Sequence, residues 1–496
     1  MIEANYYKSK IIKKKTYGII ILFYTLFQFN YGGGIMALVG AFIVPHPPLI
    51  VPEVGKGQEL KIEKTIQSYH EVAKRIAALK PETIIISSPH SIMYSDYFHI
   101  SPGKEAAGNL GQFGAGKVSY HVEYDEDFVD ALERSAEKDG IEAGTLGEKN
   151  SQLDHGTLVP LYFINQYTKD YKLVRMGLSG LSNTDHYKLG KCVAKTADKL
   201  NRRIVFVASG DLSHKLNETG PYGFAKEGPE FDEQVTQAMK TGDFLKFLEF
   251  SPDFCESAAE CGLKSFMIMS GALSGKTVES DFLSYEGTFG VGYAVCEFRI
   301  TGESEQRNFD QIFTEKQREL ARKQQETEDP YVHLARQALE YYLTTGDHMQ
   351  LPQGLPTEML SRKAGVFVSL KKHGSLRGCI GTISPVTGSV AEEILRNAVS
   401  SGLEDPRFPP VTEEELEELI YSVDVLGEPE QIASMAELDV VRYGVIVYAG
   451  RKRGLLLPNL ENVNTVEEQV AIARKKAGIY DNEAFQLERF EVVRHK

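Results

Sequence analysis

The chain lacks an excess of positive charge. Its 55 lysines and arginines are outnumbered by 69 aspartates and glutamates, which gives a formal net charge of −14. A nucleic acid or an anionic membrane surface is bound by a clustered positive field. The sequence therefore argues against both as partners.

Cysteine is scarce as well. The chain has five cysteines, and they are too scattered to form a CxxC pair or a CxxxCxxC cluster motif. This pattern is neither a disulfide framework nor a structural zinc site, and a reducing, cytoplasmic setting is expected. The cysteines are Cys192, Cys255, Cys261, Cys296 and Cys379.

Long hydrophobic runs are missing too. The apolar run at residues 18–29 (GIIILFYTLFQF) has twelve residues, whereas a membrane-spanning helix needs about 20. A signal peptide would end in an A-x-A-like cleavage site, which does not follow. The stretch YGGGIM before Met36 reads like a translated ribosome-binding sequence, and a strand-like run begins directly after it. We therefore expect residues 1–35 to be a mis-called start; a short apolar leader is the alternative.

The whole chain has the composition of a globular protein with more than one domain. Its 496 residues are 42% hydrophobic and 25% charged, too long a chain for one ordinary domain. Residues 301–329 are polar and charge-rich, as in a linker or an exposed helix. We place the boundary there, between domains at 36–300 and 330–496.

The first domain alternates short β-rich runs with stretches of helical periodicity. Near-continuous apolar strands between helices are typical of an α/β fold, with a central, mostly parallel sheet covered by helices. Strands are predicted at 38–44, 83–88, 171–178 and 203–209, helices at 58–79, 126–138 and 184–200, and a closing hairpin at 277–300.

The second domain has a smaller α+β pattern that opens with a helix at residue 330. A hairpin follows, in which His373 and Gly374 form the turn. After it we expect a helix at 388–400, a strand at 420–426, a hairpin at 443–457, a helix at 465–477 and a final strand.

Histidines follow three of the predicted strands in the first domain. His46 follows strand 38–44, His90 follows strand 83–88, and Asp211 and His214 follow strand 203–209. His155 precedes an apolar helix start. Ligands of open α/β sheets bind at the carboxyl ends of the strands, and imidazole serves metal binding and proton transfer. The histidines therefore predict one shared site.

Two histidines and a carboxylate would form the open ligand set of non-haem Fe(II). Glu256 and Glu260 lie four residues apart before an apolar helix, where an acid is costly unless it is paired or ligating. Glu260 is the preferred third ligand. Cys261 is its rival, and a thiolate would favour zinc or copper. A third interpretation leaves both glutamates in solvent.

Five segments resemble motifs of one known family, and they occur in the same order as in that family. FIVPHPPLIVPEVG, SSPH, LDHGTLVPL, SGDLSH and AAECGLKSFMIMSGAL resemble the class III extradiol ring-cleavage dioxygenase B subunits and their Memo relatives, over residues 37–300. The resemblance implies that His46 and His90 ligate Fe(II), with Glu260 as the matching acid.

The resemblance also implies roles around the metal. His155 and His214 would line the substrate and oxygen side as catalytic residues, with His214 as acid/base. Asp211 would orient His214, as carboxylates behind a functional histidine do.

Three segments of the second domain, LRGCIGT (376–382), DPRFPPVTEEEL (405–416) and GLLLPN (454–459), resemble the AMMECR family over residues 330–496. Within them Cys379 is either a thiol activated by nearby Arg377 or a small buried side chain packed beside glycines. The two domains together resemble the AmmeMemoRadiSam arrangement, which implies a radical-SAM enzyme as partner.

The leading functional hypothesis is an Fe(II)-dependent oxidoreductase, or a component of one, acting on a small molecule or a peptide. The first alternative is a metal-binding accessory protein that presents a substrate to a radical-SAM enzyme. The second is a zinc-dependent hydrolase.

Overall fold

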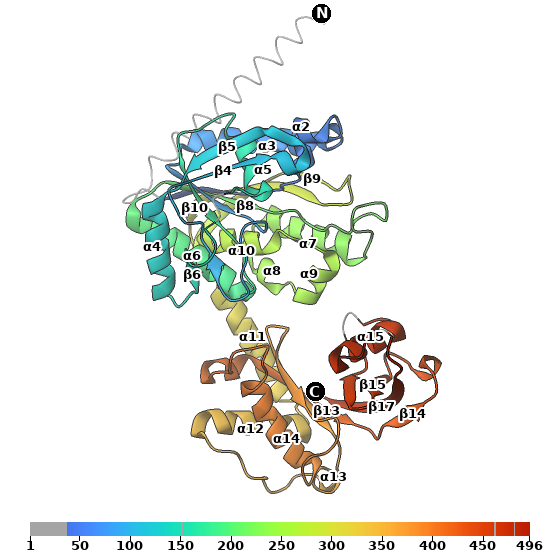
Figure 1. The fold of residues 1–496 in the computed structure, drawn as a ribbon. Helices are drawn as coiled ribbons and strands as arrows, with labels where there is room; N and C mark the ends of the chain where they lie inside the picture. The colour runs from blue at the N-terminus through green and yellow to red at the C-terminus, as the bar shows by residue number, and fades with distance from the viewer. Residues whose placement is uncertain (1–36, 150–151, 461–462, 481) are drawn as a thin grey trace, which may run out of the picture. The chain divides into compact units, whose positions relative to one another are not determined.

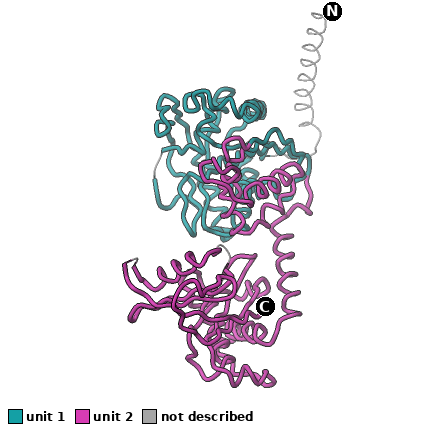
Figure 2. Tube along the Cα trace, turned by 90° about the vertical axis from the view of Figure 1, so that its right-hand side faces the viewer, with its two compact units in different colours: residues 1–210, 264–286, 294–302 teal, residues 211–263, 287–293, 303–496 magenta. Residues whose placement is uncertain are grey.

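The computed structural model describes residues 37–149, 152–460, 463–480 and 482–496, and the predicted start at residues 1–35 lies outside this part of the chain (Figure 1). The chain forms two compact units (Figure 2). The first comprises residues up to 210 with 264–286 and 294–302, and the second comprises the rest. Within the described part, no helix is long and apolar enough to span a bilayer.

The first unit is built on a six-stranded, mostly parallel sheet. The strand order is β7-β2-β8-β1-β10-β9. β8 pairs in parallel with β2 on one side and with β1 on the other, whereas β10 runs antiparallel to β1. This confirms the predicted sheet and its closing hairpin. The strands are β1 (Leu38–Val44), β2 (Thr83–Ser87), β7 (Lys172–Met176), β8 (Ile204–Ser209), β9 (Lys276–Glu286) and β10 (Tyr293–Glu303).

The middle strands are buried on both faces. Every residue of β2 and β8 is buried, which fits their continuous apolar runs because helices cover both sides of such a sheet. Figure 1 shows α3 and α5 on one side and α6 and α10 on the other. A separate hairpin of β4 (Glu105–Leu110) and β5 (Ala115–Glu123) was not predicted. The helices are α3 (Glu63–Leu79), α4 (Glu126–Lys138), α5 (His155–Ile164), α6 (Asn183–Leu200) and α10 (Leu263–Ala272).

Two glycines allow α6 and α10 to pack backbone against backbone. A Cβ on Gly190 of α6 would overlap the carbonyl oxygen of Ile268 in α10. A Cβ on Gly271 of α10 would overlap the carbonyl oxygen of Tyr187 in α6. Neither backbone can yield cheaply, so any larger residue would force the helices apart.

The second unit contains a curled antiparallel sheet with the order β12-β11-β13-β17-β15-β16, and β14 pairs with β17. The predicted turn is confirmed: His373 and Gly374 both have positive φ, 53° and 79°, as a two-residue hairpin turn of type I′ requires. Its strands are β11 (Val366–Lys372), β12 (Ser375–Gly381), β13 (Leu419–Leu426), β14 (Glu430–Ile432), β15 (Tyr443–Ala449), β16 (Lys452–Leu456) and β17 (Gln486–His495).

One face of β11 and β13 packs against helices. Val366, Val368 and Leu370 of β11 form a buried cluster with residues of α12 and α14. The sequence predicts a linker or an exposed helix for the charge-rich segment 301–329, and this segment contains the helix α11. The helices of this unit are α7 (Glu227–Thr241), α8 (Leu245–Glu249), α9 (Pro252–Ala258), α11 (Phe309–Gln325), α12 (Pro330–Thr345), α13 (Thr357–Ser361), α14 (Val390–Leu403) and α15 (Val466–Ala477).

The close approach of α6 and α10 can be tested by Gly190→Ala. We expect the substitution to lower the free energy of unfolding by about 2 kcal/mol or more, because the added methyl group has no space. Gly116→Ala is the matched control, since its nearest neighbour would be Gly111 Cα at 3.7 Å. Equal denaturant midpoints for the two variants would contradict the packing described here.

Candidate metal centre

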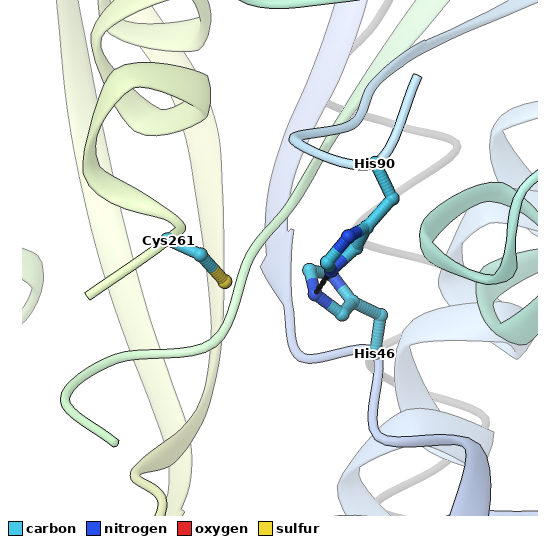
Figure 3. A group of neighbouring side chains, drawn as sticks. All are labelled: His46, His90 and Cys261. Carbon is cyan, nitrogen blue, oxygen red and sulfur yellow. Dashed lines mark hydrogen bonds between the residues drawn. The ribbon is translucent and has the colours of Figure 1, made fainter. Parts of the chain in front are cut away.

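The structure brings His46 and His90 together at the carboxyl edge of the sheet. β1 ends two residues before His46 and β2 ends three residues before His90. The two Nε2 atoms lie 3.0 Å apart (Figure 3). His46 is 1% exposed, whereas His90 is exposed. The pair is therefore anchored in the core on one side and open to solvent on the other.

The last residue of β8 contacts the buried member of this pair. Ser209 Oγ lies 3.0 Å from His46 Nδ1. The same hydroxyl donates a hydrogen bond of 2.6 Å to the carbonyl oxygen of Gly156, in the first turn of α5. Ser209 thus joins the His46 ring to the start of α5.

His155 is the first residue of α5, directly after the capping residue Asp154, whose side chain accepts from Thr157 N–H. Its ring centroid lies 3.9 Å from that of His90 and 5.5 Å from that of His46. Burial lowers the pKa of His155 to about 3, and the charges that His90 and His46 can take add to the effect. The three imidazoles therefore lie together in surroundings that oppose protonation of His155.

A serine after β2 holds the His90 loop to α5. Ser88 Oγ donates to Asp154 Oδ1 at 2.6 Å and accepts from the His90 backbone N–H at 3.2 Å. A Cβ on Gly156 would overlap Ser88 Oγ, so glycine is needed at this point. Sequence analysis missed Ser88, Ser209 and Asp154, although the serines stand at strand ends in SSPH and VASGD.

Cys261 is the third residue whose ligand atom lies near the pair. Its Sγ and one ring nitrogen from each of His46 and His90 all lie within 4.8 Å of one another (Figure 3). Burial raises the pKa of the Cys261 thiol, and the charges of Asp211 and Glu260 raise it further. The thiol donates a weak hydrogen bond of 3.7 Å to the Asp211 carbonyl oxygen.

Glu260, the preferred third ligand, has another contact. Its Oε2 accepts a hydrogen bond of 2.7 Å from the backbone N–H of Leu263, at the first turn of α10. A carboxylate at this position satisfies an otherwise unpaired helix N–H. Ligation by Glu260 stays a prediction. Its rival, Cys261, is the residue whose ligand atom lies near those of His46 and His90.

His214 and Asp211 follow β8. His214 Nδ1 donates to the carbonyl oxygen of Ala259 at 2.6 Å, and this bond leaves Nε2 as the acceptor in the neutral ring. The Ala259 carbonyl, and not the Asp211 carboxylate, accepts the Nδ1 proton. Asp211 is buried. The catalytic roles predicted for Asp211, His155 and His214 stay predictions.

The donor set fits a single transition-metal ion. Imidazole nitrogens bind such ions at about 2.1 Å, and two nitrogens at that distance and at a right angle are about 3.0 Å apart, like His46 and His90. Imidazole suits zinc, copper and iron, and a thiolate is a softer donor that zinc and copper also favour.

Comparison with known proteins identifies the family. A model described as the catalytic LigB subunit of aromatic ring-opening dioxygenase matches residues 40–296. The chain belongs to the LigB family. A second model, described as AMMECR1, matches residues 332–495. Both results confirm the resemblances found in the sequence. Members of the LigB family are typically dependent on non-haem iron.

One relative matches nearly the whole chain and another about a third of it. A protein of Clostridium acetobutylicum is 46% identical over 471 residues, which cover 93% of this chain and 100% of the relative. A Thermotoga maritima protein is 46% identical over 171 residues, 34% of this chain and 98% of that protein.

Two solved structures are similar to parts of the chain. An uncharacterized protein from Pyrococcus horikoshii has 35% identity, covers 33% of this chain and 88% of its own, and gives a TM-score of 0.31. An uncharacterized protein from Escherichia coli K12 has 16% identity, covers 52% and 99%, and gives 0.36.

Cys379 of the AMMECR1 domain has the surroundings of a packed thiol. Burial raises its pKa, although Ser369 Oγ donates to its Sγ at 3.2 Å. Arg377, the expected activating cation, instead donates to Glu415 Oε2 at 2.8 Å. These contacts favour the packing interpretation over an activated nucleophile.

His155 predicts a pH dependence of stability. An unfolded His155 binds a proton below about pH 6.5, whereas the folded residue does so only near a pKa of about 3. Between these values the unfolded state binds more protons, so metal-free protein should lose stability as pH falls from 6.5.

Urea unfolding between pH 7 and pH 4 measures this loss. We expect His155→Gln to have a flatter profile than the wild type, because glutamine does not titrate. Parallel profiles for the two proteins would show that His155 titrates alike in both states.

Proposed function

We propose that the first domain is a non-haem iron oxidoreductase, or the iron-binding component of one, that acts on a small molecule or a peptide. The observation that supports this most directly is the His46–His90 pair, with its Nε2 atoms 3.0 Å apart at the carboxyl edge of a LigB-family sheet. Fe(II) would be held by His46, His90 and a third donor, Cys261 or Glu260.

The protein residues have separate tasks in this proposal. Bound Fe(II) would supply redox chemistry and bring substrate and oxidant together. The exposed side of His90 leaves access for both. His155, kept neutral by burial, can accept a hydrogen bond from a substrate hydroxyl beside the metal. His214, with its Nδ1 proton held by the Ala259 carbonyl, can take a proton at Nε2.

A second candidate function follows from Cys261. A thiol in the described ligand group, instead of a carboxylate, favours zinc or copper over Fe(II). Tightly held zinc would suit a hydrolase, and a redox-silent metal would suit an accessory protein that presents a substrate to another enzyme. A radical-SAM enzyme stays the predicted partner in that role.

Metal analysis of anaerobically purified protein separates these functions. We expect about one iron per chain in the wild type and less than a tenth of that in His46→Ala and in His90→Ala, since each removes one of the paired nitrogens. His121→Ala is the control, because this exposed histidine contacts Glu105. It should retain the wild-type iron content.

Three outcomes would overturn the iron proposal. Stoichiometric zinc would assign the hydrolase, and no metal at all would leave only a scaffold role. Iron content unchanged in His46→Ala would place the metal elsewhere. If the iron-loaded protein consumes no oxygen with any catechol, ring opening is excluded although the metal centre stands.

The third ligand is assigned by comparing Cys261→Ser with Glu260→Gln. We expect Cys261→Ser to raise the Kd for Fe(II) at least tenfold, because the Cys261 Sγ lies with the two histidines. Glu260→Gln keeps an oxygen that can accept from Leu263 N–H, so its Kd should change less. The reverse ranking would identify Glu260 as the ligand.

A further inference from the structure

Ser209 lies between two groups that compete for one proton. Its hydroxyl is fully buried at the end of β8. It contacts the Gly156 carbonyl oxygen at 2.6 Å and His46 Nδ1 at 3.0 Å. A carbonyl oxygen can only accept, and a hydroxyl has one proton to donate. The proton of Ser209 therefore goes to Gly156, and the ring of His46 must donate to Ser209.

This order of hydrogen bonds fixes the tautomer of His46. In the neutral ring the proton is on Nδ1, and the lone pair is on Nε2. Nε2 faces His90 Nε2 at 3.0 Å. Two lone pairs would repel at that distance, so either His90 donates an Nε2–H hydrogen bond to His46 Nε2, or a metal ion lies between the two nitrogens.

We propose that Ser209 is a positioning residue that holds His46 in its metal-binding tautomer before any metal arrives. The statement on the tautomer is independent of the proposed function, and the statement on the metal rests on it.

The same hydroxyl links the metal ligand to α5. Gly156, the acceptor of the Ser209 proton, directly follows His155. Ser209 therefore connects the first turn of α5, which carries His155, to the His46 ring. The centroids of the two rings lie 5.5 Å apart. Loss of the hydroxyl would release both the His46 tautomer and the first turn of α5.

Histidine-selective ¹⁵N NMR of metal-free protein tests the tautomer. His46, assigned by the signal missing in His46→Ala, should show a protonated Nδ1 and an unprotonated Nε2 at pH 7.5. In Ser209→Ala the two forms should mix, since no acceptor remains at Nδ1. Ser209→Thr, which keeps the hydroxyl, should restore the wild-type spectrum.

Ser270→Ala controls for the loss of a buried hydroxyl. Ser270 is as buried as Ser209, and it donates to the Met267 carbonyl within α10. The His46 signals should be unchanged in Ser270→Ala, although its stability can fall. A merely structural role of Ser209 would make both alanine variants alike.

Metal affinity provides the second measurement. We expect Ser209→Ala to raise the Kd for Fe(II) about 10–100-fold, as loss of a partner behind a ligating histidine does, and Ser270→Ala to leave it unchanged. An Nε2-protonated His46 in the wild type would overturn the inference. An Nδ1-protonated His46 in a wild type that binds no metal would instead leave the tautomer standing and refute the proposed function.

Discussion

The metal centre depends on the parallel pairing of β8 with β1 on one side and β2 on the other. Strands that run in one direction end at one edge, so three separate chain segments bring residues at or after their carboxyl ends to the same place. β1 supplies His46, β2 supplies His90, and β8 between them supplies Ser209. At this shared edge the two Nε2 atoms lie 3.0 Å apart.

The electrostatics of this edge oppose protonation of the imidazoles. His46, His90 and His155 lie close together, and each would raise the cost of protonating the others. The first turn of α5 adds the positive end of a helix dipole beside His155. A transition metal binds the neutral form of imidazole through its free lone pair. The arrangement therefore keeps the histidines in the form that can ligate a metal.

Much of this could be predicted from the sequence, and the reasons are local. Strand β1 and helix α4 have the predicted bounds, because continuous apolar runs and an amphipathic period mark them clearly. His46 and His90 were found because each follows a strand. Glu260 and Cys261 are neighbours in one turn, and spacing alone does not tell which side chain points at the histidines. Ser209 was missed because its role arises from Gly156, 53 residues away.

The central claim is that a metal ion binds between His46 and His90 at the edge of the LigB-family sheet. Anomalous diffraction at the iron absorption edge, from crystals grown anaerobically with Fe(II), tests it most directly. The account predicts one strong peak within about 2.3 Å of both Nε2 atoms, in the range of metal–ligand bonds. A peak at another place in the chain, or none at full iron occupancy of the solution, would contradict it.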